Sequence, residues 1–380
     1  MNHNFSAENL PFAGNGLYVH VPFCLSKCDY CGFYSEVPGP TSIGNYLARL
    51  SQEAAERIAL PRPAFTTVFV GGGNPTCLGL DNLKRLVEII VACLPDSSAL
   101  QEWTFESNPE TLTAEILDFL ATLPAIRLSI GIQRLHDREL SVLGRRARIE
   151  SVYRALDLTF SRLKNVGGDF IMGVPNCPSL ADDLRNLVEK YPFRHISAYF
   201  LTVEENTPLQ RAVNGGLLPD PADVDAGELY EVRNALAASG FEHYEISNYA
   251  RPGFRCWHNL NYWQPGSYTG LGPAAVSGAD NIRLTNAADL ARWLAGEAPS
   301  VERLSPIDRR NEHLMLRLRL LLDGLDLVDF VRCFGEQTDE FYETLATQIN
   351  SGNLLCHQNQ VRLSDQGLRI ADEIMASLFI

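Results

Sequence analysis

Three cysteines occur within eight positions near the start of the chain, in the segment YVHVPFCLSKCDYCGFYSE. They are Cys24, Cys28 and Cys31, and they follow an apolar run with the pattern of a buried β-strand. Thiols at this spacing could form a disulfide staple, bind zinc or hold an iron–sulfur cluster. Structural zinc takes four ligands, but Phe33 occupies the next suitable position and no further cysteine or histidine follows nearby. Three thiolates on one loop therefore favour a cubane cluster, whose fourth iron is left for another ligand.

The bulk composition limits the class of protein. The chain has 380 residues and a formal net charge of −14, which argues against a nucleic-acid partner because no basic stripe could contact phosphates. No stretch reaches the roughly 18 apolar residues of an integral membrane segment. The start, MNHNFSAENLPF, lacks the basic and apolar regions of a secretory signal. The nine cysteines are an odd number, so we expect free thiols in a reducing, cytoplasmic compartment.

Strand-like and helix-like segments alternate six times between Gly16 and about Glu205. The predicted strands are Leu17–Phe23, Thr67–Val70, Trp103–Glu106, Arg127–Ile132, Gly168–Met172 and His195–Leu201. The helical patterns between them are Ile43–Ile58, Leu80–Leu94, Ala114–Leu123, Ile149–Phe160 and Ala181–Tyr191. Because parallel strands need helical crossovers, these units predict an α/β fold with a parallel sheet. Six units rather than eight indicate an open or partial (β/α)6 barrel, with a doubly wound sheet as the alternative.

Polar or glycine-bearing turns follow each of these predicted strands. They read PFC, GGGNP, ESNP, GIQ, GDF…GVP and SAYF. In parallel sheets the functional residues gather at the carboxyl ends of the strands. We therefore expect the cysteines, which follow the first strand, to share one site with the turns that follow the other strands.

The second part of the chain has a different pattern. Its predicted segments are a loop at 208–227, a helix at 227–239, an extended region through Tyr268, helices at 306–322 and 338–350, the hairpin LLCHQNQVRLS and a last helix from Asp365. Helices with a two-stranded wing indicate a small winged-helix-like module, and the acidic charge favours packing or docking over DNA binding. We expect a core of residues 1–298, whose barrel reaches about residue 205, and a C-terminal module of residues 299–380.

Several motifs carry a resemblance to a known family. C-x3-C-x-Y-C followed by an aromatic residue resembles the cluster-binding signature of radical S-adenosylmethionine (SAM) proteins, and GGGNPT at Gly71–Thr76 resembles their glycine-rich turn. Similarity to the oxygen-independent coproporphyrinogen oxidase-like family extends over ESNPETL, RLSIGIQRLHDRELSVLGRRA, GGDFIMGVP, HISAYFLTVEENTPL and YEISNYARPGFRCWHNLNYW. The resemblance implies a radical SAM barrel with a [4Fe-4S] cluster whose unique iron binds S-adenosylmethionine. Electron transfer from the cluster then cleaves this cofactor to a 5′-deoxyadenosyl radical.

The same resemblance implies the site residues. Cys24, Cys28 and Cys31 would hold the cluster. The residues implied for S-adenosylmethionine, of which the coproporphyrinogen enzyme binds two molecules, are Tyr18, Tyr30, Gly72, Gly73, Asn74, Glu106, Gln133, Arg145 and Asp169. Arginine can clamp a carboxylate, while acidic and amide side chains can hold ammonium and ribose groups. The alternative is that Glu106, Arg145 and Asp169 form structural ion pairs at the strand ends.

Two features indicate a branch of that family. Coproporphyrinogen oxidases resemble C-x3-C-x2-C-x-C, whereas this chain has Phe33 at the last position, as in the haem chaperones. HNLNYW, at 258–263, resembles the HNxxYW motif of those chaperones, which implies haem as a further ligand and His258 as its candidate axial ligand. A structural turn is the alternative for His258, and Cys256 and His243 are alternative ligands nearby.

This branch also implies a function. Its members would bind haem or a porphyrin, pass the haem to a recipient haemoprotein, and take electrons from a donor such as flavodoxin or ferredoxin. Two enzymatic alternatives stay open at this point. They are the anaerobic oxidative decarboxylation of coproporphyrinogen III and methyl transfer by a class C radical SAM methyltransferase.

Overall fold

The computed structural model describes residues 15–58, 64–95, 100–221 and 227–379. The N-terminal segment assessed for a secretory signal lies outside these residues. Within the described part, no helix is both long and apolar enough to cross a membrane.

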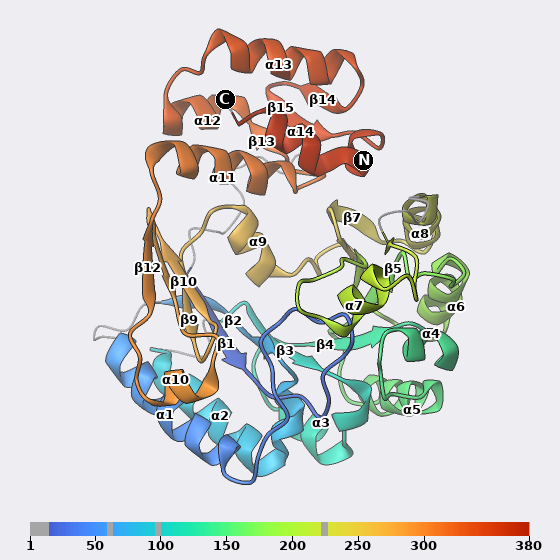
Figure 1. Cartoon of the computed structure of the whole chain (residues 1–380), viewed down its shortest axis with the longest axis vertical. Helices are drawn as coiled ribbons and strands as arrows, with labels where there is room; N and C mark the ends of the chain where they lie inside the picture. Colours follow the sequence, from blue (N-terminus) through green and yellow to red (C-terminus); the bar gives the residue numbers. More distant parts are fainter. Residues whose placement is uncertain (1–14, 59–63, 96–99, 222–226, 380) are drawn as a thin grey trace.

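Six strand–helix units form the core of the fold (Figure 1). The strands are β1 (Asn15–Val21), β2 (Phe65–Gly72), β3 (Glu102–Ser107), β4 (Ile126–Gln133), β5 (Val166–Met172) and β6 (His195–Phe200). The helices are α1 (Ser42–Arg57), α2 (Leu80–Cys93), α3 (Ala114–Leu120), α4 (Asp137–Val142), α5 (Ile149–Phe160) and α6 (Ala181–Lys190). The six strands pair in parallel and in chain order, without the reversal of order that a doubly wound sheet requires. This confirms the partial barrel.

Residues on the two faces of this sheet differ in polarity. On the outer face Leu17, Val68 and Trp103 are neighbours across β1–β3, and Phe105 is the neighbour of Leu128 on β4. All five are fully buried beneath the helices. The inner face carries polar and ionisable side chains, which are Tyr18, His20, Thr67, Glu102, Thr104, Glu106, Arg127, Ser129, Asp169, His195, Ser197 and Tyr199. Because side chains alternate along a strand, the same strands build the core on one side and a polar concave surface on the other.

Further strands extend the sheet at both edges, giving twelve strands among the described residues. Beside β6 are β8 (Asn248–Ala250) and β7 (Glu242–Glu245), while beside β1 are β9 (Tyr268–Leu271), β10 (Val276–Ala279), β11 (Ile282–Thr285) and β12 (Ser300–Arg303). Of these, β9 is parallel to β1 and the others pair antiparallel. They are three or four residues long, too short for the period-two pattern to indicate them reliably.

Two sequence-based predictions are wrong in this region. The predicted loop contains a helix, α7 (Pro208–Asn214), which begins after Thr207, whose hydroxyl accepts a hydrogen bond from the Gln210 backbone N–H. The predicted extended region contains α9 (Trp257–Trp263), so HNLNYW is helical. The backbone N–H groups at the start of α9 donate to Glu102 on β3, and a cap so distant along the chain leaves no local signal in the sequence.

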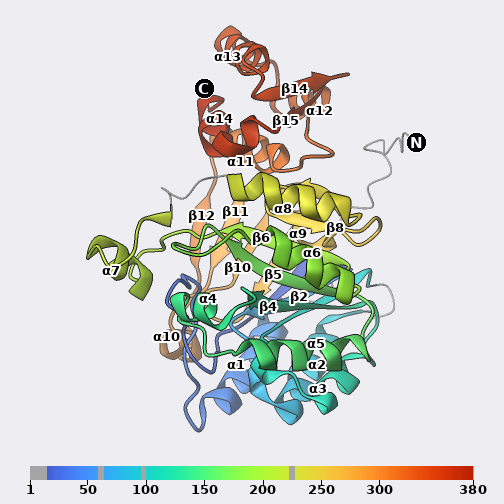
Figure 2. The same cartoon turned by 90° about the vertical axis from the view of Figure 1, so that its right-hand side faces the viewer.

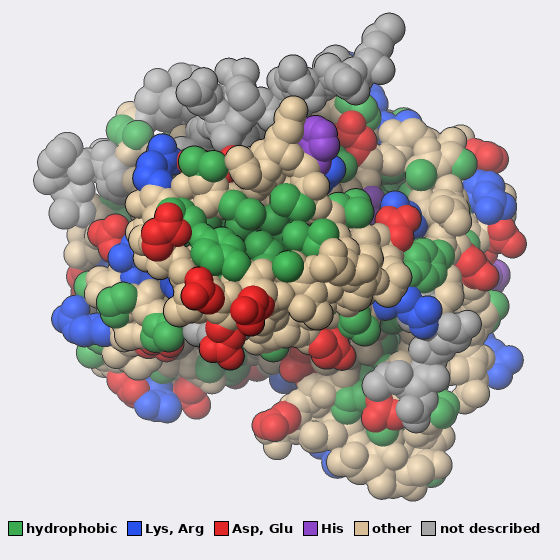
Figure 3. All heavy atoms as spheres, turned by 90° about the horizontal axis from the view of Figure 1, so that it is seen from above, with side chains coloured by type: hydrophobic (Ala, Val, Ile, Leu, Met, Phe, Trp, Pro, Cys, Tyr) green, Lys and Arg blue, Asp and Glu red, His purple; other side chains and the backbone are tan. Residues whose placement is uncertain are grey.

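The C-terminal module packs against the side of the core that carries α8 (Gly227–Ala238) and α9 (Figure 2). It contains α11 (Pro306–Leu318), β13 (Leu325–Asp326), α12 (Leu327–Phe334), α13 (Asp339–Asn350), β14 (Leu354–His357), β15 (Gln360–Leu363), a 3-10 turn (Gly367–Ile370) and α14 (Ala371–Ser377). Because β12 still pairs with β11, we propose that the module begins at residue 304 rather than 299. Its outer face presents a group of hydrophobic side chains flanked by acidic ones (Figure 3).

A buried carboxylate joins the late strands to the first helix. Glu53 on α1 accepts hydrogen bonds from the Gly272 backbone N–H at 2.8 Å, from Asn286 Nδ2 at 2.8 Å and from Trp293 Nε1 at 3.3 Å. Arg57 Nε lies 3.3 Å from the same carboxylate. Three groups that are distant in sequence, and Arg57 one turn along the same helix, therefore depend on one side chain.

We expect Glu53→Ala to lower the free energy of unfolding by about 3 kcal/mol, because it leaves several buried donors without an acceptor. Urea unfolding followed by far-UV circular dichroism measures this change. Glu56→Ala, on the exposed side of the same helix, is the matched control and should have little effect. Equal losses in the two variants would contradict this role for Glu53.

Candidate functional site

A cavity of about 560 Å³ opens on the inner face of the sheet, at the carboxyl ends of the strands. The sequence-predicted site residues that line it are Cys24, Cys28, Tyr30, Cys31, Gly72, Gly73, Glu106, Gln133, Arg145 and Asp169. They come from five strand ends and the loops that follow them. Three predicted residues, Tyr18, Asn74 and His258, do not line this cavity.

The cysteine loop follows β1 and is closed by backbone hydrogen bonds. The Cys24 N–H donates to Glu36 O at 3.0 Å, and the Glu36 N–H donates to Pro22 O at 2.8 Å. Cys24, Cys28 and Cys31 are free thiols that are partly exposed toward the cavity. No three His, Cys, Asp or Glu side chains of the described residues converge on a position for one metal ion. The three thiols interact electrostatically with one another and line the same cavity. In a cubane cluster each cysteine binds a different iron.

Burial affects the protonation of these thiols. It raises the pKa of Cys24 to about 11 and also raises the pKa of Cys31. Metal ligation requires thiolates, so the charge of bound iron must displace these protons. The loop therefore offers thiols that a bound cluster can convert into thiolate ligands.

The glycine-rich turn after β2 is fixed against the base of the cysteine loop. The Gly73 N–H donates to Val21 O at 2.9 Å, and the Asn74 N–H donates to Phe23 O at 2.7 Å. A Cβ at position 73 would lie 2.6 Å from both of these carbonyl oxygens, so only glycine fits there. The two segments are thus held as one unit beside the cavity.

Two carboxyl groups lie on the inner wall of the cavity. Glu106 accepts a hydrogen bond from the Gly72 N–H at 2.9 Å, and Asp169 accepts from the Ser129 hydroxyl at 3.0 Å. Burial, followed by the charge of Asp169, raises the pKa of Glu106 to about 7. Burial likewise raises the pKa of Asp169. Neither forms an ion pair within the described part of the chain, so the alternative of structural ion pairs gains no support for these two residues.

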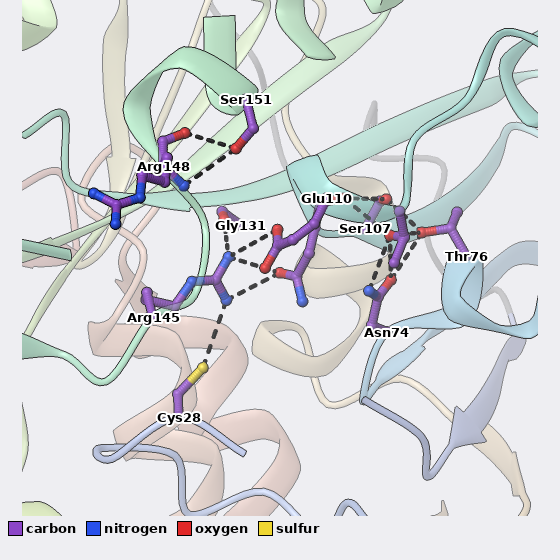
Figure 4. Close-up of polar contacts among 11 residues, drawn as sticks. Cys28, Asn74, Thr76, Ser107, Glu110, Gly131, Arg145, Arg148 and Ser151 are labelled. Carbon is purple, nitrogen blue, oxygen red and sulfur yellow. Dashed lines mark hydrogen bonds and ion pairs between the residues drawn. The ribbon is translucent and has the colours of Figure 1, made fainter. Parts of the chain in front are cut away.

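Arg145 lies at the cysteine end of the cavity (Figure 4). Its Nη1 is 3.6 Å from Cys28 Sγ, and its Nη2 donates to Gly131 O at 2.7 Å. Both nitrogens donate to Asn108 Oδ1 at 3.1 Å, while its one carboxylate neighbour, Glu110, is 3.8 Å away. The guanidinium is therefore oriented mainly by neutral groups and places a positive charge beside a cluster ligand.

Asn74 and Tyr18 have different environments from those expected. The Asn74 side chain is 2% exposed and points into a polar cluster, where it bonds to Thr111 and Thr76 (Figure 4). It therefore supports the glycine-rich turn from behind. The Tyr18 hydroxyl is hydrogen-bonded to His20 Nδ1 at 3.0 Å, and its ring lies beside Phe69.

His258 is buried on the inner side of the sheet. Its ring is hydrogen-bonded through Nδ1 to the Thr67 hydroxyl at 2.9 Å and through Nε2 to the Tyr262 hydroxyl at 3.0 Å. Burial lowers its pKa to about 3, so the ring is neutral. Gly16 makes room for it, since a Cβ there would lie 3.0 Å from the imidazole. Both ring nitrogens have partners, so this arrangement gives no support to the predicted axial ligation. The partners are side chains of β2 and α9, and His258 itself lies in a helix rather than in a turn with backbone partners.

Neither alternative haem ligand lines the cavity. Cys256 is fully buried, and its thiol donates to Glu102 at 3.4 Å. His243 Nε2 is hydrogen-bonded to Ile246 O at 3.0 Å, while its Nδ1 is buried without a hydrogen bond and its ring is stacked on Tyr249. From the HNLNYW helix, Asn259 is the residue that reaches the cavity wall.

Several cavity residues were not predicted from the sequence. They are Phe69, Arg127, Ser129, Ser197, Tyr199 and Asn259. All but Asn259 belong to the inner-face positions of the strands, where polar residues at every second position interrupt apolar runs. That period-two pattern was the available signal for them.

Comparison with known proteins agrees with this geometry. The sequence model of the Radical SAM superfamily matches residues 18–178, and that of the HemN C-terminal domain matches residues 304–370. The chain is 33% identical to "Heme chaperone HemW" of Mycobacterium tuberculosis (strain H37Rv), covering 96% of this chain and 94% of that protein. It is 32% identical to "Heme chaperone HemW" of Escherichia coli (strain K12), covering 89% and 91%. 

Among solved structures, the coproporphyrinogen III oxidase HemN of Escherichia coli superposes with a TM-score of 0.81. The match covers 96% of this chain and 90% of that chain at 20% identity, which establishes a shared fold. The near-full-length similarity to the HemW proteins is more specific than the shared fold. The chain therefore belongs to the HemW family of the radical SAM superfamily.

Proposed function

We propose that this protein is a haem chaperone, which binds haem and passes it to a recipient haemoprotein. The observation that carries the proposal is the similarity to HemW proteins over nearly the whole chain. Phe33 adds support, because its side chain is 69% exposed at the cavity mouth, where the coproporphyrinogen oxidase pattern has a fourth cysteine. The oxidase and methyltransferase alternatives have no comparable observation in their favour.

The cofactors of the radical SAM superfamily are a [4Fe-4S] cluster and S-adenosylmethionine, and the cavity suits both. When bound and reduced, the cluster supplies the electron that cleaves the sulfonium of S-adenosylmethionine. We assign Cys24, Cys28 and Cys31 to the cluster. Arg145 would hold a carboxylate beside Cys28, and Glu106 and Asp169 would supply negative charge for the sulfonium cofactor. The glycine-rich turn would let the cofactor approach the backbone at Gly72 and Gly73.

The proposal also names partners and a compartment. A small one-electron donor such as flavodoxin or ferredoxin would reduce the cluster, and the recipient is a haemoprotein. All nine cysteines are free thiols, as is typical of proteins in a reducing compartment such as the cytoplasm.

We expect purified protein titrated with haem to show a saturable change in the Soret band, and the complex to load an apo-haemoprotein. In parallel, incubation of the reconstituted protein with coproporphyrinogen III, S-adenosylmethionine and a reductant should yield no protoporphyrinogen IX. Absorbance spectroscopy and chromatography measure the two results. A Soret change that does not saturate, or formation of the decarboxylated product, would count against the chaperone.

We expect His258→Ala to lower the free energy of unfolding by about 3 kcal/mol, because it leaves a cavity and removes the partner of the buried Thr67 hydroxyl. The haem spectrum of the folded variant should change little, since the ring has no open nitrogen. His136→Ala, an exposed histidine, is the matched control for stability. Loss of the haem spectrum without loss of stability would restore His258 as the axial ligand.

Cofactor affinity should depend on pH through Glu106. Because its pKa is raised to about 7, lowering the pH from 8 to 6 protonates the carboxyl and removes a negative charge near the sulfonium. We expect the affinity for S-adenosylmethionine to fall about tenfold over this range. Equilibrium dialysis with the anaerobically reconstituted protein measures it. Glu106→Gln should bind S-adenosylmethionine weakly at both pH values, and the exposed control Glu150→Gln should behave as wild type. A wild-type affinity that does not change between pH 8 and pH 6 would contradict this role for Glu106.

A further inference from the structure

Arg127 lines the floor of the cavity and has no hydrogen-bonded or ion-paired partner among the described residues. It is the second residue of β4, its side chain is 2% exposed, and it lines the cavity. Its Nε is buried without a hydrogen bond. Among the described residues, no acceptor bonds to its guanidinium and no carboxylate oxygen lies within 4.0 Å of it. Arginine stays protonated in proteins, so this is a buried positive charge whose guanidinium has no acceptor in contact.

The carboxylates around Arg127 already have other partners. Glu102 accepts from the first N–H groups of α9, Glu106 accepts from Gly72, and Asp169 accepts from Ser129. Burial of an unpaired charge is costly unless an anion with good geometry compensates for it. The charges of Glu102 and Asp169 act on Arg127 from beyond 4.0 Å, so the guanidinium lacks an anionic acceptor in hydrogen-bonding contact rather than negative charge nearby.

The cavity leaves space for such a group. Gly167, on the neighbouring strand, lies against the guanidinium, and a Cβ there would be 3.3 Å from Arg127 Nη2. Phe69 and Asn259 also line the cavity, so the guanidinium shares it with an aromatic ring and an amide. Arg145 belongs to the opposite end, beside Cys28. A ligand held at the cluster would use Arg145, which leaves Arg127 for a different carboxylate.

We propose that Arg127 binds the carboxylate of a second ligand at the floor of this cavity, through the two-pronged contact that a guanidinium makes with a carboxylate. The inference rests on the proposed function for the identity of that ligand. Two sources share this chemistry, a propionate arm of haem and the amino-acid carboxylate of a second S-adenosylmethionine.

The test compares carboxylate and ester forms of one ligand. Haem and haem dimethyl ester, in which the propionates are esterified, are titrated into the reconstituted full-length protein as wild type, Arg127→Gln and Arg127→Lys. The number of bound S-adenosylmethionine molecules is measured in the same proteins by equilibrium dialysis. Arg310→Gln, which removes a buried and hydrogen-bonded arginine from the C-terminal module, is the control. Arg127→Lys keeps the positive charge but loses the two parallel N–H donors. It therefore replaces Arg127→Gln in both measurements if the glutamine variant does not fold.

If haem supplies the carboxylate, wild type should bind haem roughly tenfold to a hundredfold more tightly than the ester, and the Arg127 variants should bind both equally. If S-adenosylmethionine supplies it, the variants should bind one molecule fewer than wild type, with haem unaffected. The inference is overturned if the variants match wild type and Arg310→Gln in both measurements. If wild type binds no haem, the chaperone proposal fails, and the S-adenosylmethionine count alone decides the role of Arg127.

Discussion

Charged side chains on the inner face of the sheet are buried or half-buried and need hydrogen-bond partners there. Strand alternation directs Glu102, Glu106, Arg127 and Asp169 to this face, because the apolar residues between them form the core beneath the helices. Burial of such groups is costly unless each receives hydrogen bonds. Much of the rest of the structure meets this requirement. The start of α9 donates to Glu102, the glycine-rich turn donates to Glu106, and serine donates to Asp169.

The same requirement positions the candidate site. Once the turn donates to Glu106 and is bonded to the base of the cysteine loop, the three thiols are held at one end of the cavity. Arg145 adds a positive charge there, which suits thiolate ligands and a carboxylate ligand. Most buried polar groups on the inner face thus have hydrogen-bond partners within the protein. The three cysteine thiols and the guanidinium groups of Arg127 and Arg145 are the groups left to bind ligands.

The sequence predicted the parts of the fold whose signals are local. The six strands and the helices α1, α2, α3, α5 and α6 follow from periodicity, whereas the short α4 was not predicted. The predicted bounds of α5, Ile149–Phe160, are those of the structure. The sequence did not predict α9, whose cap comes from Glu102 on another strand, or the short edge strands. The cysteine spacing identified the cluster loop because all three residues lie on one segment. Spacing alone could not show that the Asn74 side chain turns away from the cavity, or that His258 is enclosed by Thr67 and Tyr262.

One cavity should hold both an iron–sulfur cluster on the three cysteines and S-adenosylmethionine at the open iron. The decisive measurement is electron paramagnetic resonance of the anaerobically reconstituted, reduced protein. We expect a [4Fe-4S] signal that changes on addition of S-adenosylmethionine and is lost when Cys24, Cys28 and Cys31 are replaced by alanine. A cluster signal that is the same with and without S-adenosylmethionine would contradict it.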